Sequence, residues 1–235
     1  MNTKDTSVLA IVIGSMLVTG IAGAQEKDQV QASSGGHNLD PVKDAVELTI
    51  GSGYAQGLGN VTSGQSLTDV GTAGGAVQLS LGYRIIPQLS LGVYGSGSMF
   101  GRADHEVDSS TKLYSASAGL DSAWHFLPAH SEWDPWISLG TGWRGYWQQQ
   151  DQGQTAMQGW EIAKLQTGVD FRVDKSIAIS PVIGADLTTF FTQQTPQSSG
   201  YANIHSPQVT TFLFAGLQGR FDIPTGSGAS QVASR

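Results

Sequence analysis

The most constraining feature of the sequence is an alternation of apolar and polar residues that recurs along most of its length. Within residues 75–86, Val77, Leu79 and Leu81 are separated by single polar residues. Successive side chains of a β-strand point to opposite faces, so this period of two predicts strands with one apolar face. Eight such runs occur, at residues 45–55, 75–86, 89–100, 113–126, 136–147, 160–173, 177–191 and 208–222. No helix-period segment competes with them, and the sequence therefore predicts an all-β chain.

The connections between these runs differ in length. Tight turns are predicted at residues 86–88 and 174–176. The other connections are longer, at residues 56–74, 101–112, 127–135, 148–159 and 192–207. Short and long connections in this order are typical of an up-and-down barrel with one elaborated rim. We therefore predict an eight-stranded antiparallel up-and-down transmembrane β-barrel over residues 45–222, followed by a C-terminal tail at residues 223–235.

The segment before the barrel has the features of a secretory signal. It contains Lys4, an apolar run from Val8 to Val18 and the small-residue site Ala22-Gly23-Ala24. The run is shorter than the roughly 20 residues that a spanning helix needs, which favours a signal peptide over an uncleaved anchor. We predict a signal peptide at residues 1–24 and a flexible N-terminal segment at residues 25–44. An exported chain of this kind is either a soluble or a membrane barrel.

The composition excludes several classes of function. The chain has no cysteine, which removes disulfides, thiolate metal sites and catalytic thiols. Its 12 Lys and Arg against 19 Asp and Glu argue against nucleic-acid binding. The GxGxxG match at Gly140–Gly145 lies in a strand with no following helix, and Asp104, Glu106 and Asp108 lack the spacing of a calcium loop. We therefore predict no cofactor and no metal site.

The polar face of the runs favours a membrane barrel. It consists mostly of Gly and Ser with sparse charges, which suits the narrow interior of an eight-stranded cylinder. Each Arg or Lys turned to lipid would cost about 2–4 kcal/mol at the bilayer midplane, so we expect the apolar face to contact lipid. The lumen charges fall into two groups by depth, Asp121, Arg144, Lys164 and Asp186 in one, and Glu47, Arg84, Asp170, Arg172 and Arg220 nearer the tight turns.

The nine lumen charges predict an ion-pair network. Four acids and five bases nearly balance, which favours mutual pairing over an ion-selective channel. The alternative is a constriction in a narrow pore, where polar side chains select solutes.

Aromatic residues gather near both ends of the predicted strands. One set is Tyr83, Trp124, Phe126, Phe171 and Phe221, and the other is Tyr54, Tyr114, Trp147, Trp160 and Phe191. Two aromatic girdles at headgroup level are typical of membrane barrels. Phe190, Phe212 and Phe214 fall instead on the lumen side of the pattern, which leaves a bulge or a slipped register there as an alternative.

The leader, the alternation of loop lengths and three of the predicted strands together point to a known family. The three strands are Ala76–Ile85, Lys164–Val173 and Phe212–Phe221. With these features the chain resembles the eight-stranded outer-membrane β-barrels of Gram-negative bacteria, the OmpA/OmpX-like group. The resemblance implies a place in the bacterial outer membrane. It also implies contacts with outer-membrane lipid and lipopolysaccharide, folding by the barrel-assembly machinery, and a monomer. The topology predicts tight turns in the periplasm and long loops outside the cell.

The sequence predicts a structural or surface-interaction role without catalysis. One alternative is a narrow passive pore for small solutes. A less favoured one is a lipid-modifying enzyme, which needs a histidine with a serine, and often a carboxylate, within reach of lipid. Asp104, His105 and Ser109 share one long loop and are the nearest approach to such a set. The long loops rich in Gly, Ser, Thr and Gln are either recognition surfaces or plain caps.

Overall fold

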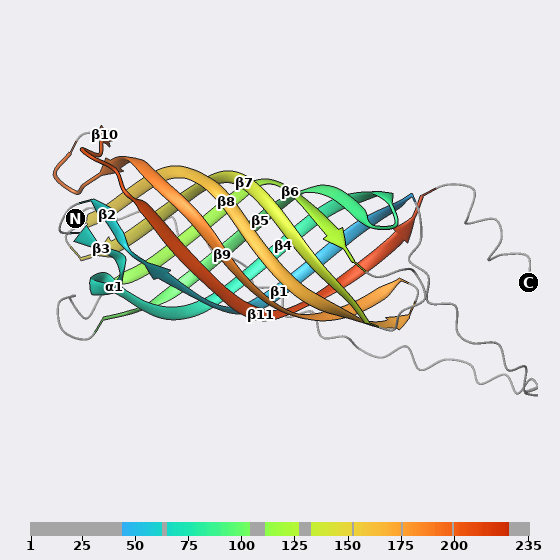
Figure 1. Ribbon diagram of the computed structural model, residues 1–235. Helices are drawn as coiled ribbons and strands as arrows, with labels where there is room; N and C mark the ends of the chain where they lie inside the picture. The colour runs from blue at the N-terminus through green and yellow to red at the C-terminus, as the bar shows by residue number, and fades with distance from the viewer. Residues whose placement is uncertain are drawn as a thin grey trace, which may run out of the picture. The chain divides into compact units, whose positions relative to one another are not determined.

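The computed structural model describes residues 44–62, 65–103, 111–126, 133–151, 153–174, 176–198 and 200–225. Its long strands are β1 (Ala45–Leu58), β4 (Gly71–Ile86), β5 (Leu89–Arg102), β6 (Lys112–His125), β7 (Trp133–Gln150), β8 (Gly153–Asp174), β9 (Ile177–Gln194) and β11 (Val209–Pro224). All pairings are antiparallel, and the order β9-β11-β1-β4-β5-β6-β7-β8 closes through β8 and β9 (Figure 1). The predicted eight-stranded barrel is confirmed.

The barrel has two different ends. At the short-turn end, β4 meets β5 and β8 meets β9, and Ala45 pairs with Pro224. At the opposite, long-loop end lie β2 (Asn60–Thr62), β3 (Gln65–Ser66), α1 (Leu67–Val70) and β10 (Ala202–Asn203). In the described part of the chain, no helix is long and apolar enough to cross a membrane. The predicted signal peptide, the N-terminal segment except Asp44, and most of the predicted tail lie outside the described residues.

The two faces of the strands point as the alternation predicts. Leu81, Ile183 and Leu217 are 51%, 63% and 60% exposed on the outer wall, whereas Arg84 and Asp170 are fully buried inside. A belt of exposed Leu, Ile and Val around a barrel with buried Arg is stable only where lipid covers the belt. The outer wall is therefore the membrane-contacting surface.

The strands at the long-loop end extend further than predicted. The Gln-rich stretch 148–159, predicted as a long loop, is a tight hairpin in which Gln150 pairs with Gly153. β8 consequently spans 22 residues. Beyond the bilayer a strand no longer has lipid on one side and the charged lumen on the other, so apolar and polar residues no longer alternate and the period-two signal disappears.

Candidate functional site: the lumen

Charged side chains fill the lumen at the short-turn end, in a set that we call the short-turn cluster. Its members are Glu47, Arg84, His125, Asp134, Asp170, Arg172, Arg220 and Asp222, all less than 9% exposed. Arg84 Nη2 lies 2.9 Å from Glu47 Oε2 and 3.6 Å from Asp222 Oδ1. Arg172 Nη1 lies 3.6 Å from the other oxygen of Asp222. The five charges predicted at this depth are thus brought together.

Arg220 is the centre of the short-turn cluster. Its Nη1 contacts Asp170, and its Nε lies 3.4 Å from Asp222 Oδ1 and 4.0 Å from Glu47 Oε1. The hydroxyl of Ser180 donates a hydrogen bond to Asp170. One cation therefore holds carboxylates from β1, β8 and β11 together.

His125 links two walls of the barrel. Its Nδ1 lies 2.8 Å from Asp134 Oδ2, and its Nε2 lies 3.3 Å from Arg220 Nη1. A guanidinium group can only donate, so Nε2 accepts from Arg220 and Nδ1 donates to Asp134. Because β6 and β11 are four strands apart in an eight-stranded ring, this contact crosses the lumen.

The same residues form a candidate metal set. His125, Asp134 and Asp170 each bring one ligand atom within 4.8 Å of the others. Arg220, however, contacts both Asp170 and His125, and its positive charge lies where a bound cation would be repelled. The arrangement therefore fits an ion-pair cluster better than a metal site.

A second set, the long-loop cluster, lies further along the lumen and consists of Tyr94, Arg144, Glu161, Lys164 and Asp186. Arg144 Nη2 lies 2.5 Å from Glu161 Oε2 and also contacts Asp186. Lys164 Nζ lies 3.4 Å from Asp186 Oδ1. Tyr94 Oη donates to Glu161 Oε1 at 2.6 Å. Three of the four charges predicted at this depth meet here.

Asp121, the fourth predicted charge, has a different place. It is half-buried, and among the described residues it joins no ion pair of either cluster. It lines a small cavity of about 40 Å³ together with His125, Trp136 and Arg220. Such a volume holds about one or two water molecules.

The sequence does not predict Glu161 as a lumen residue, because a bulge in β8 changes which residues face inward. Gly142 of β7 pairs with Glu161, whereas Gly140 pairs with Lys164, so β8 has one extra residue at this point. Glu161 and Lys164 consequently both face the lumen, while Trp160 and Leu165 both face lipid. The sequence predicts that Trp160 and Leu165 both face outward, although they are five residues apart. In a regular strand, residues an odd number apart face opposite sides, so this conflict is the signal that reveals the bulge.

The charge balance of the lumen differs from the predicted one. The described residues place seven carboxylates inside, against five Lys and Arg, because Asp134, Glu161 and Asp222 join those predicted. Asp134 lies at the start of β7, two residues before the predicted strand, and Asp222 is on the predicted polar face of β11. The predicted excess of one base is therefore wrong.

Apolar side chains close the lumen at the long-loop end. This apolar plug consists of Val61, Leu67, Leu113, Tyr146, Met157, Phe190 and Phe212. Arg144 Cζ lies 4.3 Å from the ring centroid of Phe212, so the plug rests directly on the long-loop cluster. The pairing of β9 with β11 is unbroken from Val209 to Phe221, and the slipped-register alternative for Phe212 and Phe214 is wrong.

The middle of the lumen is crossed by a side-chain bridge. Gln166 Nε2 donates to Gln78 Oε1 at 2.8 Å. β8 and β4 are four strands apart, so this bond joins opposite walls. Rings, amides and ion pairs thus interrupt the lumen at successive depths.

The predicted girdle residues lie on the outer wall. Tyr54, Tyr83, Trp124, Phe126, Trp160, Phe171, Phe191 and Phe221 are exposed, and Tyr114 and Trp147 are half-exposed. Trp143, which was not predicted as a girdle residue, pairs with Trp160 across β7 and β8. Its ring centroid lies 6.1 Å from that of Trp147.

The described residues do not test the loop set of the enzyme alternative. Asp104, His105 and Ser109 lie outside the described residues. His125 has an acidic partner, but Ser180 is bonded to Asp170 and not to His125.

Comparisons with known proteins place the fold. No family model matches the chain, and no curated protein does. Among solved structures, neisserial surface protein A is similar, with a TM-score of 0.50 and 16% identity over 75% of this chain and 96% of its own. The N-terminal barrel domain of Pseudomonas aeruginosa OprF has a TM-score of 0.47 and 14% identity, covering 77% and 99%. The outer-membrane protease OmpT from Escherichia coli has a TM-score of 0.41 and 7% identity, covering 77% and 97%.

The chain has the fold of an eight-stranded outer-membrane β-barrel. The belt of exposed Leu, Ile and Val on a barrel of this fold agrees with the predicted outer-membrane location. At these identities the likeness extends to the fold alone, so the role of the barrel is argued from its own residues.

Proposed function

We propose that this outer-membrane barrel is a closed scaffold, which neither conducts solutes nor catalyses a reaction, and acts through its surface at the long-loop end. The observation that carries the proposal is the apolar plug, in which Phe190 and Phe212 are buried over the Arg144 ion pairs. A hydrated ion cannot pass packed aromatic rings without displacing them. The Gln78–Gln166 bridge blocks the path a second time.

Conductance in planar bilayers tests the closed lumen. Barrel that shows heat-modified gel mobility, and is therefore folded, is expected to leave the membrane silent. A general porin in the same membranes is the positive control. Steady unitary currents from the folded barrel would establish the passive pore instead.

The absence of catalysis has its own test. Lipid A isolated from cells with and without the protein is expected to give the same mass spectrum. A deacylated or additionally acylated species that depends on expression would support the lipid-modifying alternative.

The surface offered at the long-loop end is a paired hairpin. β7 and β8 stay in register from Trp147 and Ala156 to Gln150 and Gly153, and β6 pairs β7 as far as Gln149. A platform of this kind presents amide side chains at fixed spacing to a partner outside the bilayer. Backbone amides of residues 148–150 are expected to exchange slowly with solvent, because most donate within the sheet. Exchange at the rate of an open loop would contradict a rigid platform.

A further inference from the structure

One part of the lipid-facing wall consists of small side chains. Gly97 of β5 pairs with Ala116 of β6, and Gly95 pairs with Ala118. All four positions point away from the lumen, since Leu120 and Val93, next in the same two columns, are exposed. The wall is therefore thin here, with backbone close to its outer surface.

Packing within the chain does not require these glycines. A Cβ at Gly97 would meet only Val77 Cγ2, at 3.9 Å, and one at Gly95 only Ser117 O, at 3.8 Å. By contrast, a Cβ on Gly142, which faces the lumen, would collide with the backbone of β6. Glycine in a strand costs roughly 0.5–1 kcal/mol relative to alanine and often marks a bulge or the close approach of another molecule. The β5–β6 register has no bulge, which leaves the close approach.

The thin wall is part of a groove of about 910 Å³. Gly95, Gly97, Ser52 and Gly219 are small outward residues along it, and Leu79 is among the larger ones beside them. The groove crosses β9, β11, β1, β4 and β5 on the membrane-contacting surface. An apolar depression in this position is filled from the bilayer, and an acyl chain has the shape for it.

A cation, Lys112, lies beyond the groove on the side of the long-loop end. The outward column of β6 reads Lys112, Tyr114, Ala116 and Ala118 toward the short-turn end. At about 3.3 Å per residue, Lys112 is about 13 Å from Ala116, on the side of the long loops. Of the seven Lys and Arg among the described residues, five are in the lumen, and the other two are the exposed Lys112 and Arg102.

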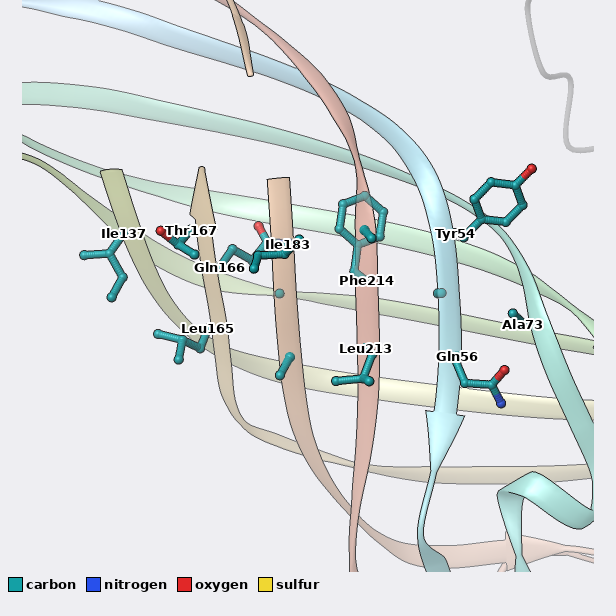
Figure 2. A pocket seen from close by; sticks show the side chains of 14 residues that line it. Tyr54, Gln56, Ala73, Ile137, Leu165, Gln166, Thr167, Ile183, Leu213 and Phe214 are labelled. Carbon is teal, nitrogen blue, oxygen red and sulfur yellow. The ribbon is translucent and has the colours of Figure 1, made fainter. Parts of the chain in front are cut away.

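A second groove provides an internal comparison. It has a volume of about 560 Å³ and runs across β7, β8, β9, β11, β1 and the start of β4 (Figure 2). Figure 2 shows Leu165, Leu213 and Tyr54 along it, with Gln56 near one end. No Lys or Arg is among the residues that line this groove.

We propose that the first groove binds one anionic lipid, with an acyl chain across Gly95 and Gly97 and the phosphate beside Lys112. The glycines admit the acyl chain, and Lys112, the exposed cation in the outward column of β6, attracts the headgroup. The site does not depend on whether the lumen conducts, so conductance measurements leave it untouched.

Native mass spectrometry of the detergent-solubilised full chain tests the site. The probes are phosphatidylglycerol and phosphatidylcholine with identical acyl chains, supplied in equal amounts. The wild type is expected to retain one lipid with about a fivefold preference for phosphatidylglycerol, the effect of one lysine near an anionic headgroup. Lys112→Gln should abolish the preference, and Lys112→Arg should keep it. Gly97→Leu should lose the retained lipid, because the new side chain occupies the groove.

Ala215→Leu, which fills the second groove, is the matched control and is expected to keep both the lipid and the preference. Heat-modified mobility shows that each variant is folded. Equal retention by Gly97→Leu and Ala215→Leu would overturn the acyl-chain site. An unchanged preference in Lys112→Gln would overturn the headgroup site. A change from monomer to dimer, or the reverse, in Gly97→Leu alone would assign the surface to a contact between copies and overturn the lipid proposal.

Discussion

The two halves of the lumen are closed by different forces. At the short-turn end, eight ionisable side chains pack against one another and leave a cavity large enough for water. At the long-loop end, the five ionisable side chains of the long-loop cluster lie under a layer of aromatic and aliphatic residues. The first half depends on the neutralisation of charge, and the second adds hydrophobic packing. The lumen of one small barrel can therefore be closed by ion pairing or by hydrophobic packing. Single substitutions should distinguish the contributions of the two to stability.

The largest effect is expected from Arg220→Met in the short-turn cluster. Its removal leaves Asp170 without its guanidinium and weakens the pairing of Glu47 and Asp222, which should cost about 5 kcal/mol of unfolding free energy. Urea unfolding followed by gel mobility measures this. The control Lys112→Met, at an exposed cation, should change stability by less than about 0.5 kcal/mol. Equal midpoints for the two variants would show that the cluster is not stabilised by its charges.

A smaller loss is expected from Arg144→Ala in the long-loop cluster. Glu161 loses its cation, but Asp186 keeps Lys164 and Glu161 keeps the Tyr94 hydroxyl. The cost should be about 3 kcal/mol, at the lower end for a broken buried pair. Heat-modified mobility and the urea midpoint measure it. An unchanged midpoint would disprove the ion-pair network at this depth.

The smallest effect distinguishes the plug from the outer wall. Phe212→Leu shortens a fully packed ring and should cost about 1–2 kcal/mol, because a small cavity remains. Phe221→Leu makes the same change on the lipid-facing surface, where acyl chains fill the space, and should be nearly neutral. The pair of urea midpoints measures the difference. Equal losses would show that the plug is no better packed than the surface.

Much of this architecture could be predicted because the bilayer imposes a two-sided environment on each strand. Inside the membrane an arginine such as Arg84 can face only the lumen, so its position in the alternation shows which face of the strand is the inner one. The prediction of a long loop at residues 148–159 is wrong because the strands there extend beyond the bilayer. The stretch around Gln150 no longer has lipid on one side and the charged lumen on the other, and its pairing left no periodic pattern.

Other features of the lumen escaped prediction for a geometric reason. The alternation places Phe190 and Phe212 on the lumen side, but it does not show that a rim segment carrying Val61 and Leu67 packs against them. A period-two pattern describes one strand at a time and does not show what another segment brings to its inner face. The partnership of Asp134 with His125 likewise depends on where two strands end at the same rim.

The bulge in β8 has a consequence for how such a chain can change length. Ile162 is the extra residue between Glu161 and Ala163. Deleting it would remove the bulge and leave Trp160 and Leu165 four residues apart, so both would still face lipid while Glu161 and Lys164 would still face the lumen. Loss of one residue at the bulge is therefore expected to preserve both faces of β8, whereas loss of one residue from β5, which has no bulge against β6, would swap the inner and outer sets on one side of the deletion.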